Sequence, residues 1–399
     1  MSARPRVLVA GGGFAGLETT FYLRHTLGDV VDLTLVSEHP YFHFKPNTIY
    51  IPFGEEPEQF KVYLDRAIAR KHITFVQDRF VGVVPDTKHA FLEHGELTYD
   101  YLVVATGAGM RPAEIPGLEA HALTVWTPDE MLRLRDGLAR LVEEAKGGAT
   151  RRLLFLIPPN NRCSGPLYEM VMMVDTWLRR QGVRERIDLT WTTFEESYIQ
   201  AFGPRLNTVV TDEFEERGVH GFKGFTVSGI EPGIVRYQNG ETRGFDLLVA
   251  FPPYVAARAY DSLPSDDRGF VHVEADSRRV RGQSSIFAVG DAADFPIKQA
   301  FLALLQADAA GEHIAADRAC LGHWIGKMPW HPLGHQGRGG TIYQWTLGFN
   351  SFAPQIATNR GHTDFANYLL SESDETTQFL VACVTADRSR AMQLLSQDP

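Results

Sequence analysis

This chain of 399 residues contains few cysteines, no excess of basic residues and no long apolar run. Its three cysteines, Cys163, Cys320 and Cys383, are too few and too scattered for a disulfide scaffold or a zinc site. The formal net charge of -10 argues against nucleic acid as a partner. No apolar run approaches the roughly 18–20 residues that span a bilayer. We therefore expect a cytoplasmic globular protein, and leave open both peripheral contact with the inner face of a membrane and homo-oligomerisation.

Two glycine motifs lie near opposite ends of the chain, each directly after a short apolar stretch. The first, V-L-V-A-G-G-G-F-A-G from Val7 to Gly16, is a strand pattern that leads into G-x-G-x-x-G. Such glycines let a strand turn sharply into a helix whose N-terminal N–H groups face a pyrophosphate. The second, S-I-F-A-V-G-D-A from Ser285 to Ala292, places Asp291 at a strand end, where a carboxylate suits the ribityl hydroxyls of FAD. Together the two motifs predict one FAD-binding domain that is interrupted by an insertion.

The end of the second strand predicts the adenosine end of that site. An acidic residue about 20 positions after the glycines binds the ribose in such domains, and Glu38 fits this spacing. Ser37 is an alternative for the same role, and a surface glutamate without a ligand is another. Residues 39–60 are rich in aromatic residues and proline, which predicts an ordered loop over a ligand.

Alternating strand and helix patterns predict an α/β fold with two Rossmann-like domains, the second inserted in the first. Strands of the first domain are expected at residues 6–10, 32–36, 99–107 and 285–289, and its helices at 14–27 and 301–319. Strands of the second are expected at 153–157, 187–191 and 247–251, and its helices at 128–146, 168–180 and 205–217. The predicted domains are residues 1–112 and 268–325 for FAD, residues 113–267 for the second unit, and residues 326–399 for a C-terminal tail.

The turn after the first strand of the second unit lacks the glycines of a nucleotide site. It reads I-P-P-N-N-R-C-S-G-P-L-Y-E from Ile157 to Glu169. Prolines and asparagines cannot form the glycine turn that admits a pyrophosphate, so the place for NAD(P)H has no phosphate cradle. Cys163 stands there instead, just before a helix and beside Arg162, and both features lower the pKa of a thiol. We therefore predict a redox-active thiolate, with a small buried core residue as the alternative.

Glu169 lies near the start of the same predicted helix. It is either a proton carrier toward a flavin or a quinone, or an acid that complements the helix dipole.

Five segments together resemble the sulfide:quinone oxidoreductase and flavocytochrome c sulfide dehydrogenase group. They are G-G-G-F-A-G, P-Y-F-H-F-K-P, Y-L-V-V-A-T-G, R-C-S-G-P-L-Y-E and I-F-A-V-G-D. The resemblance covers residues 5–320, and its most specific part is the segment around Cys163. It implies membership of the flavoproteins with two dinucleotide-binding domains, within the pyridine nucleotide-disulfide oxidoreductase superfamily.

The resemblance also implies residue roles, with Cys163 as the flavin-proximal thiol that attacks the flavin or carries a persulfide. Lys45 and Pro46 would lie along the isoalloxazine, with Lys298 and Gln299 near its pyrimidine end. There the Lys298 charge would stabilise the reduced flavin. The other implied FAD contacts are Gly11, Gly13, Phe14, Ala15, Gly16, Ser37, Glu38, Thr106, Gly107, Gly290 and Asp291. FAD should be non-covalent, because residues 39–60 contain no cysteine. No metal is expected, since the histidines show no ligand spacing.

One departure from the group concerns its second cysteine, which follows the closing helix. Residues 328–337 contain no cysteine, and Cys320 or Cys383 would reach the flavin only if the tail folds back. The resemblance thus implies oxidation of sulfide through FAD, with a quinone or another electron acceptor, by a chain without the usual cysteine pair. One alternative is an enzyme like type II NADH:quinone dehydrogenases, which the Pro-Pro-Asn-Asn turn disfavours. The other is a non-catalytic or regulatory flavoprotein.

Overall fold

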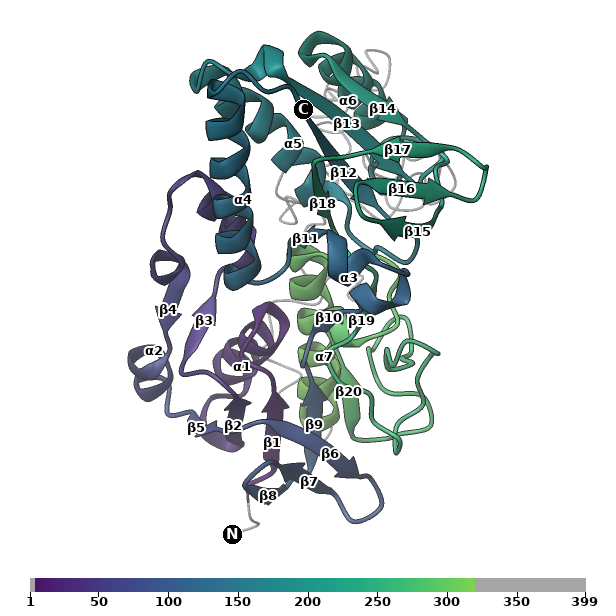
Figure 1. The fold of residues 1–399 in the computed structure, drawn as a ribbon. Helices are drawn as coiled ribbons and strands as arrows, with labels where there is room; N and C mark the ends of the chain where they lie inside the picture. The colour runs from purple at the N-terminus through teal and green to yellow at the C-terminus, as the bar shows by residue number, and fades with distance from the viewer. Residues whose placement is uncertain (1–3, 320–399) are drawn as a thin grey trace, which may run out of the picture. The chain divides into compact units, whose positions relative to one another are not determined.

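The computed structural model describes residues 4–319, which contain two five-stranded parallel sheets (Figure 1). The first sheet has the strand order β20-β9-β1-β2-β5. Its strands are β1 (Arg6–Ala10), β2 (Asp32–Ser37), β5 (Thr74–Gln77), β9 (Tyr101–Val104) and β20 (Ile286–Ala288). Helix α1 (Phe14–Leu27) follows β1, and α7 (Ala300–Ala319) follows β20. Strand β20 pairs with β9, although all strands of the second sheet lie between these two in the sequence. The predicted insertion is therefore confirmed.

The second sheet has the order β11-β18-β12-β13-β14. Its strands are β11 (Leu123–Thr124), β12 (Arg151–Ile157), β13 (Ile187–Thr193), β14 (Val219–Phe222) and β18 (Leu247–Ala250). Its helices are α4 (Pro128–Lys146), α5 (Gly165–Arg180) and α6 (Pro204–Arg217). Helix α4 has the predicted bounds, because Thr127 and Glu130 form a capping box at its start. Helix α5 begins three residues earlier than predicted, because proline is tolerated in a first helical turn.

Both faces of the second sheet are buried, which explains the continuous apolar sequence of its central strand. Successive side chains of β12 point to opposite faces. Leu153, Phe155 and Ile157 therefore lie in one core cluster, and Leu154 and Leu156 lie in another.

Shorter elements connect the two sheets and cover their ends. Antiparallel pairings join β3 (Tyr41–His43) with β4 (Lys61–Tyr63), and β10 (Ala108–Met110) with β19 (Tyr254–Ala256). One three-stranded sheet comprises β6 (Phe80–Val84), β7 (His89–Leu92) and β8 (Gly95–Thr98). Another comprises β15 (Val227–Glu231), β16 (Ile234–Tyr237) and β17 (Thr242–Gly244). The short helices are α2 (Asp65–Arg70) and α3 (Leu118–His121). The chain leaves the first sheet through β10 and returns through β19. The domain boundaries named above stay predictions, and the tail from residue 326 lies outside the described residues.

The loop predicted at residues 39–60 is ordered, with strand β3 and two 3₁₀ segments, Lys45–Phe53 and Pro57–Phe60. Arg135 of α4 fastens it: its guanidinium donates to the Ile51 carbonyl at 2.8 Å and pairs with Glu56 at 3.0 Å.

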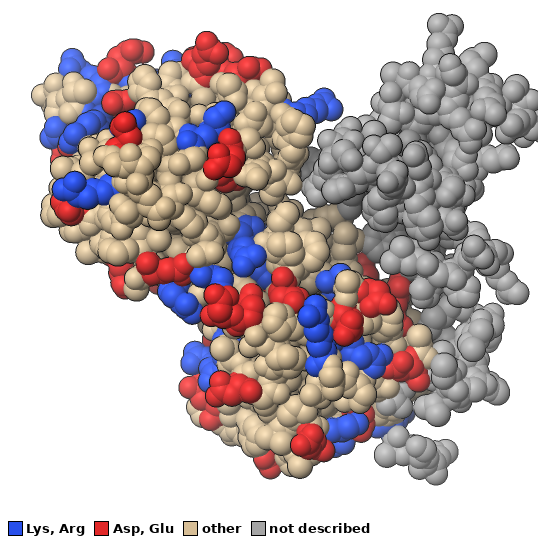
Figure 2. Space-filling model, turned by 90° about the vertical axis from the view of Figure 1, so that its right-hand side faces the viewer, with Lys and Arg blue, Asp and Glu red and all other residues tan. Residues whose placement is uncertain are grey.

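Charged side chains of both signs are interspersed on the face shown in Figure 2. Charge on this face is therefore mixed and not gathered into a field of one sign. None of the helices within residues 4–319 combines the length and the apolar character that crossing a bilayer requires.

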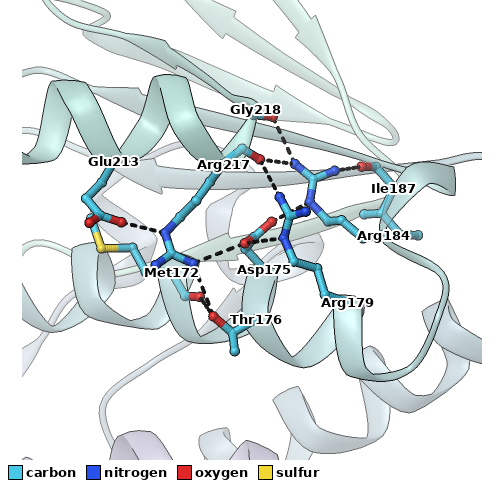
Figure 3. Close-up of polar contacts among 9 residues, drawn as sticks. All are labelled: Met172, Asp175, Thr176, Arg179, Arg184, Ile187, Glu213, Arg217 and Gly218. Atoms are coloured by element: carbon cyan, nitrogen blue, oxygen red, sulfur yellow. Dashed lines mark hydrogen bonds and ion pairs between the residues drawn. The ribbon is translucent and has the colours of Figure 1, made fainter.

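Asp175 of α5 is a fully buried carboxylate that three arginines surround (Figure 3). Arg184 Nε lies 2.5 Å, Arg179 Nε 2.9 Å and Arg217 Nη1 3.2 Å from its oxygens. Burial raises the pKa of Asp175, but hydrogen bonds from Arg179 and Arg184 outweigh it, so the pKa is lowered overall. Further guanidinium N–H groups of Arg179 and Arg184 donate to backbone carbonyls at the ends of neighbouring elements. The cluster therefore joins α5, α6 and the start of β13.

We expect Asp175→Asn to reduce the free energy of unfolding by about 3 kcal/mol, because it leaves the largely buried Arg184 guanidinium without its carboxylate. Urea denaturation measures this change. Glu213→Gln is the matched control, since it removes a more exposed partner of Arg217 and should cost at most about 1 kcal/mol. Equal small losses in both variants would contradict the prediction.

Candidate functional site

A cavity of about 770 Å³ is lined by loops that follow strands of both sheets. From the first sheet these are the loops after β1, β2, β5, β9 and β20. From the second they are the loops after β11, β12 and β18. Ligands of open α/β sheets bind outside the carboxyl ends of the strands, so this cavity is where the fold predicts a site.

The glycine loop after β1 forms a cradle that side chains would fill. Gly11 has φ +123°, and a Cβ there would lie 2.2 Å from the Ala105 carbonyl oxygen. A Cβ on Gly16 would lie 1.8 Å from the Gly11 carbonyl oxygen, so only glycine lets α1 pack this closely against the loop. A Cβ on Gly13 would meet no protein atom within 4 Å, and Gly13 lines the cavity at the N-cap of α1. No side chain caps this helix, so its first N–H groups are available to a phosphate. The residues fit the pyrophosphate of FAD.

At the end of β2 both candidates for the ribose line the cavity. Ser37 is buried, and its Oγ would lie 2.4 Å from a Cβ on Gly12, so it packs against the glycine loop. Glu38 is half-exposed, and Arg79 Nε lies 3.0 Å from its carboxylate. Arg79 also lines the cavity, and the sequence analysis missed it because it lies in a different strand connection.

Two lysines and a carboxylate lie at the other end of the cavity. Lys45 Nζ lies 3.7 Å from the centroid of the Trp126 ring, and burial lowers its pKa to about 8. Lys298 is buried, with Nζ 3.8 Å from the centroid of Phe270, and burial likewise lowers its pKa to about 8. Burial raises the pKa of Asp291, against the opposing charges of Lys298 and Lys45. This end therefore carries a net cationic charge that suits an electron-rich ring.

Cys163 lies in the wall of the same cavity, two residues before α5. The prediction of a depressed thiol pKa is wrong. Burial raises the pKa of Cys163 to about 12, the carboxylate of Asp291 adds to the rise, and a hydrogen bond from the Gly165 backbone offsets only part of it. Arg162 is not among the groups that shift this pKa, and its guanidinium donates to the Pro296 carbonyl at 3.4 Å. Solvent exclusion thus outweighs the helix N-terminus, and the resting group is a neutral thiol.

The turn that carries Cys163 is tied to neighbouring loops. Asn161 Oδ1 accepts the Cys163 N–H at 3.0 Å, and Asn161 Nδ2 donates to the Phe251 carbonyl at 3.0 Å. Asn160 has φ +64° and donates to Glu114 at 2.7 Å, and its carbonyl accepts the Tyr254 N–H at 2.9 Å. Asparagines that bond to neighbouring loops therefore stand in the turn where a phosphate cradle would have glycines.

The structure brings most of the predicted site residues together around the cavity. Those that line it are Gly11, Gly13, Phe14, Ala15, Ser37, Glu38, Lys45, Pro46, Thr106, Gly107, Cys163, Glu169, Asp291, Lys298 and Gln299. Gly16 and Gly290 pack behind this surface, Gly290 with φ +64° against Ala15. Glu169 lies exposed on α5, and Cys320 and Cys383 lie outside the described residues.

Sequence reasoning missed Trp126, Met131 and Tyr254, which also line the cavity. A signal for Tyr254 was present: Pro158-Pro159 directly follows β12, and Pro252-Pro253 follows β18 after one intervening residue, Phe251. These strands are parallel neighbours, with Leu156 opposite Ala250, so their loops meet at one edge.

One group of possible metal ligands lies at the surface. Asp78, Glu93 and His94 have ligand atoms within 4.8 Å of one another. Asp78 accepts hydrogen bonds from the backbone of Arg79 and His94, and Arg79 pairs with Glu93 at 3.7 Å. We assign no metal to this group.

Comparisons with known proteins agree with this geometry. Residues 5–146 match the family model described as pyridine nucleotide-disulphide oxidoreductase. A sulfide-quinone reductase of Aquifex aeolicus is 30% identical over 244 residues, which are 59% of this chain but only 55% of that protein. The crystal structure of the Aquifex aeolicus sulfide:quinone oxidoreductase superposes with a TM-score of 0.71 at 24% identity, over 79% of this chain and 77% of that one.

A second kind of relative is the type II NADH:quinone oxidoreductase of Staphylococcus epidermidis, 24% identical over 309 residues, 73% of this chain and 75% of that protein. The family and the sulfide:quinone relatives bind FAD, and FAD is the cofactor that the glycine cradle fits. Residues 5–146 therefore match the pyridine nucleotide-disulphide oxidoreductases, and the chain is similar to the sulfide:quinone oxidoreductases in sequence and in fold.

Proposed function

We propose that this protein is an FAD-dependent oxidoreductase that oxidises sulfide and passes two electrons to a quinone. The observation that carries the proposal is the place of Cys163, in the wall of the cavity that also contains the glycine cradle and the two buried lysines. A single thiol at that place supplies the atom to which a sulfur substrate binds. Another small electron acceptor in place of the quinone is the alternative for the second half of the reaction.

The proposed reaction forms a persulfide on Cys163. The thiol and hydrogen sulfide combine to Cys–S–SH, with the loss of two protons and two electrons. When bound, FAD supplies the acceptor for the two electrons and passes them to the quinone, which takes up two protons to become the quinol.

Side chains around the cavity assist this chemistry. Lys45 and Lys298 stabilise negative charge that develops beside them. Cys163 is a neutral thiol, so its proton has to leave during the reaction. Glu169, exposed on α5 and part of the cavity lining, is our candidate for the group that carries protons to solvent.

NADH is the competing donor, because type II NADH:quinone oxidoreductases are among the relatives. The hydrogen bonds of Asn160 and Asn161 argue against it, since they fill the turn where a dinucleotide would be bound. A regulatory flavoprotein without turnover is the remaining alternative.

We expect anaerobic sulfide to bleach the visible absorbance of the FAD-loaded protein within the dead time of manual mixing. NADH and NADPH should bleach it slower than about 1 per second, the lower end of enzymatic turnover. Stopped-flow spectroscopy with each donor measures both rates. Fast bleaching by NADH would favour the dehydrogenase alternative, and a flavin that stays yellow with every donor would favour the regulatory one.

A further inference from the structure

Glu195 is a buried carboxylate whose four hydrogen-bond donors are all neutral. Ser164 Oγ donates at 3.0 Å, Tyr168 OH at 2.8 Å, Thr193 Oγ1 at 2.9 Å and the Gln200 N–H at 3.1 Å. Desolvation of a carboxylate without a cationic partner is unfavourable unless several hydrogen bonds offset it. A buried carboxylate with only neutral donors therefore suggests a role for Glu195 beyond packing.

The place of Glu195 in the topology suggests the reason. In the first unit β1, α1 and β2 lead to Glu38, the candidate ribose carboxylate. In the second unit β12, α5 and β13 lead in the same way to Glu195, two residues after β13 ends at Thr193. Glu195 thus stands where a nicotinamide dinucleotide would find its ribose carboxylate, but its oxygens are turned to α5.

Two of its donors lie at the start of that helix. Ser164 is the N-cap of α5 and directly follows Cys163; its hydroxyl makes no capping bond, and it donates to Glu195. Tyr168 is buried one turn later and packs on Trp191, with ring centroids 4.1 Å apart. Glu195 therefore fastens the helix turn on one side of Cys163, while Asn161 fastens the turn on the other side.

We propose that Glu195 is a positioning residue for Cys163. At the position that corresponds to the ribose carboxylate, it holds the start of α5 and thereby the thiol at the cavity wall. This inference rests on the proposed role of Cys163 in sulfide oxidation. Glu195 itself does not line the cavity, so it acts through Ser164 and not on the substrate. Its carboxylate, together with that of Asp291, also contributes to the raised pKa of the Cys163 thiol.

Alkylation of Cys163 by iodoacetamide tests the proposal without any enzymatic turnover. Its rate is followed by mass spectrometry of the Cys163 peptide of the FAD-loaded protein, from neutral to mildly alkaline pH. Glu195→Gln keeps the shape of the side chain but removes its charge, so the pH profile should shift downward. A shift of one unit makes alkylation about tenfold faster at a given pH. Glu196→Gln is the matched control: it removes an exposed carboxylate one residue away and should change the rate less than about twofold.

The kinetics of sulfide-dependent reduction give the second measurement. Because Glu195 holds the thiol but does not contact the cavity, Glu195→Gln should lower kcat several-fold with KM for sulfide nearly unchanged. Ser164→Ala keeps the Glu195 charge and removes only the link to the helix turn. It should likewise lower kcat, and it should speed alkylation because a loosened turn exposes the Cys163 thiol. It carries the test if Glu195→Gln does not fold.

Folded Glu195→Gln or Ser164→Ala protein with wild-type alkylation and wild-type kcat would overturn the proposal. If sulfide fails to reduce even the wild-type protein, the proposed function fails, and the alkylation profile alone decides whether Glu195 positions Cys163.

Discussion

Gly13→Val is expected to yield a folded protein that binds no FAD. A Cβ at position 13 would meet no protein atom within 4 Å, so we expect the native fold to accommodate the new side chain. It would instead project into the cavity at the N-terminus of α1, where the pyrophosphate must approach the backbone closely. Absorption spectroscopy of the purified protein, with FAD released by acid precipitation, measures the FAD content. Release into the supernatant also tests the non-covalent attachment.

Gly95→Val is the control for this experiment, because Gly95 also has open space around it but lies in β8 and not in the cavity lining. It should bind FAD as the wild type does. Gly16→Val should instead destabilise the fold, since its Cβ would collide with the Gly11 carbonyl. A yellow Gly13→Val protein with a full complement of FAD would refute the placement of the pyrophosphate.

Cys163→Ser should retain FAD and lose most sulfide-dependent flavin reduction, on the order of a hundredfold or more. A hydroxyl is close to a thiol in size, so the turn held by Asn161 should keep its conformation. The hydroxyl cannot form the persulfide, and the loss would therefore be chemical. Anaerobic stopped-flow reduction by sulfide measures the rate, and thermal unfolding verifies that the variant is folded.

Cys320→Ser and Cys383→Ser are the controls, and both should reduce nearly as fast as the wild type. Wild-type reduction by the Cys163→Ser protein would mean that Cys163 only packs, which favours the regulatory alternative. Loss of activity in Cys383→Ser alone would mean that the second thiol comes from the tail.

The sequence alone determined the features that depend on neighbouring residues in the chain. The glycine loop could be recognised because a strand–helix turn of this kind needs glycine at fixed spacing. The bounds of α4 followed from a 3.6-residue apolar period, and the structure adds the Thr127 cap at its start. The inserted second unit followed from two flavin motifs at opposite ends of the chain, and β20 beside β9 bears this out.

The tertiary structure alone decided the properties that depend on contacts between distant residues. Position in the sequence predicts a thiolate at Cys163, whereas burial and the distant Asp291 carboxylate make it a neutral thiol. No local pattern marks Glu195 as the partner of Ser164, 31 residues away, or unites Asp175 with Arg217. Burial and electrostatic fields sum over groups from the whole fold, so a residue's motif fixes its chemistry but not its charge state.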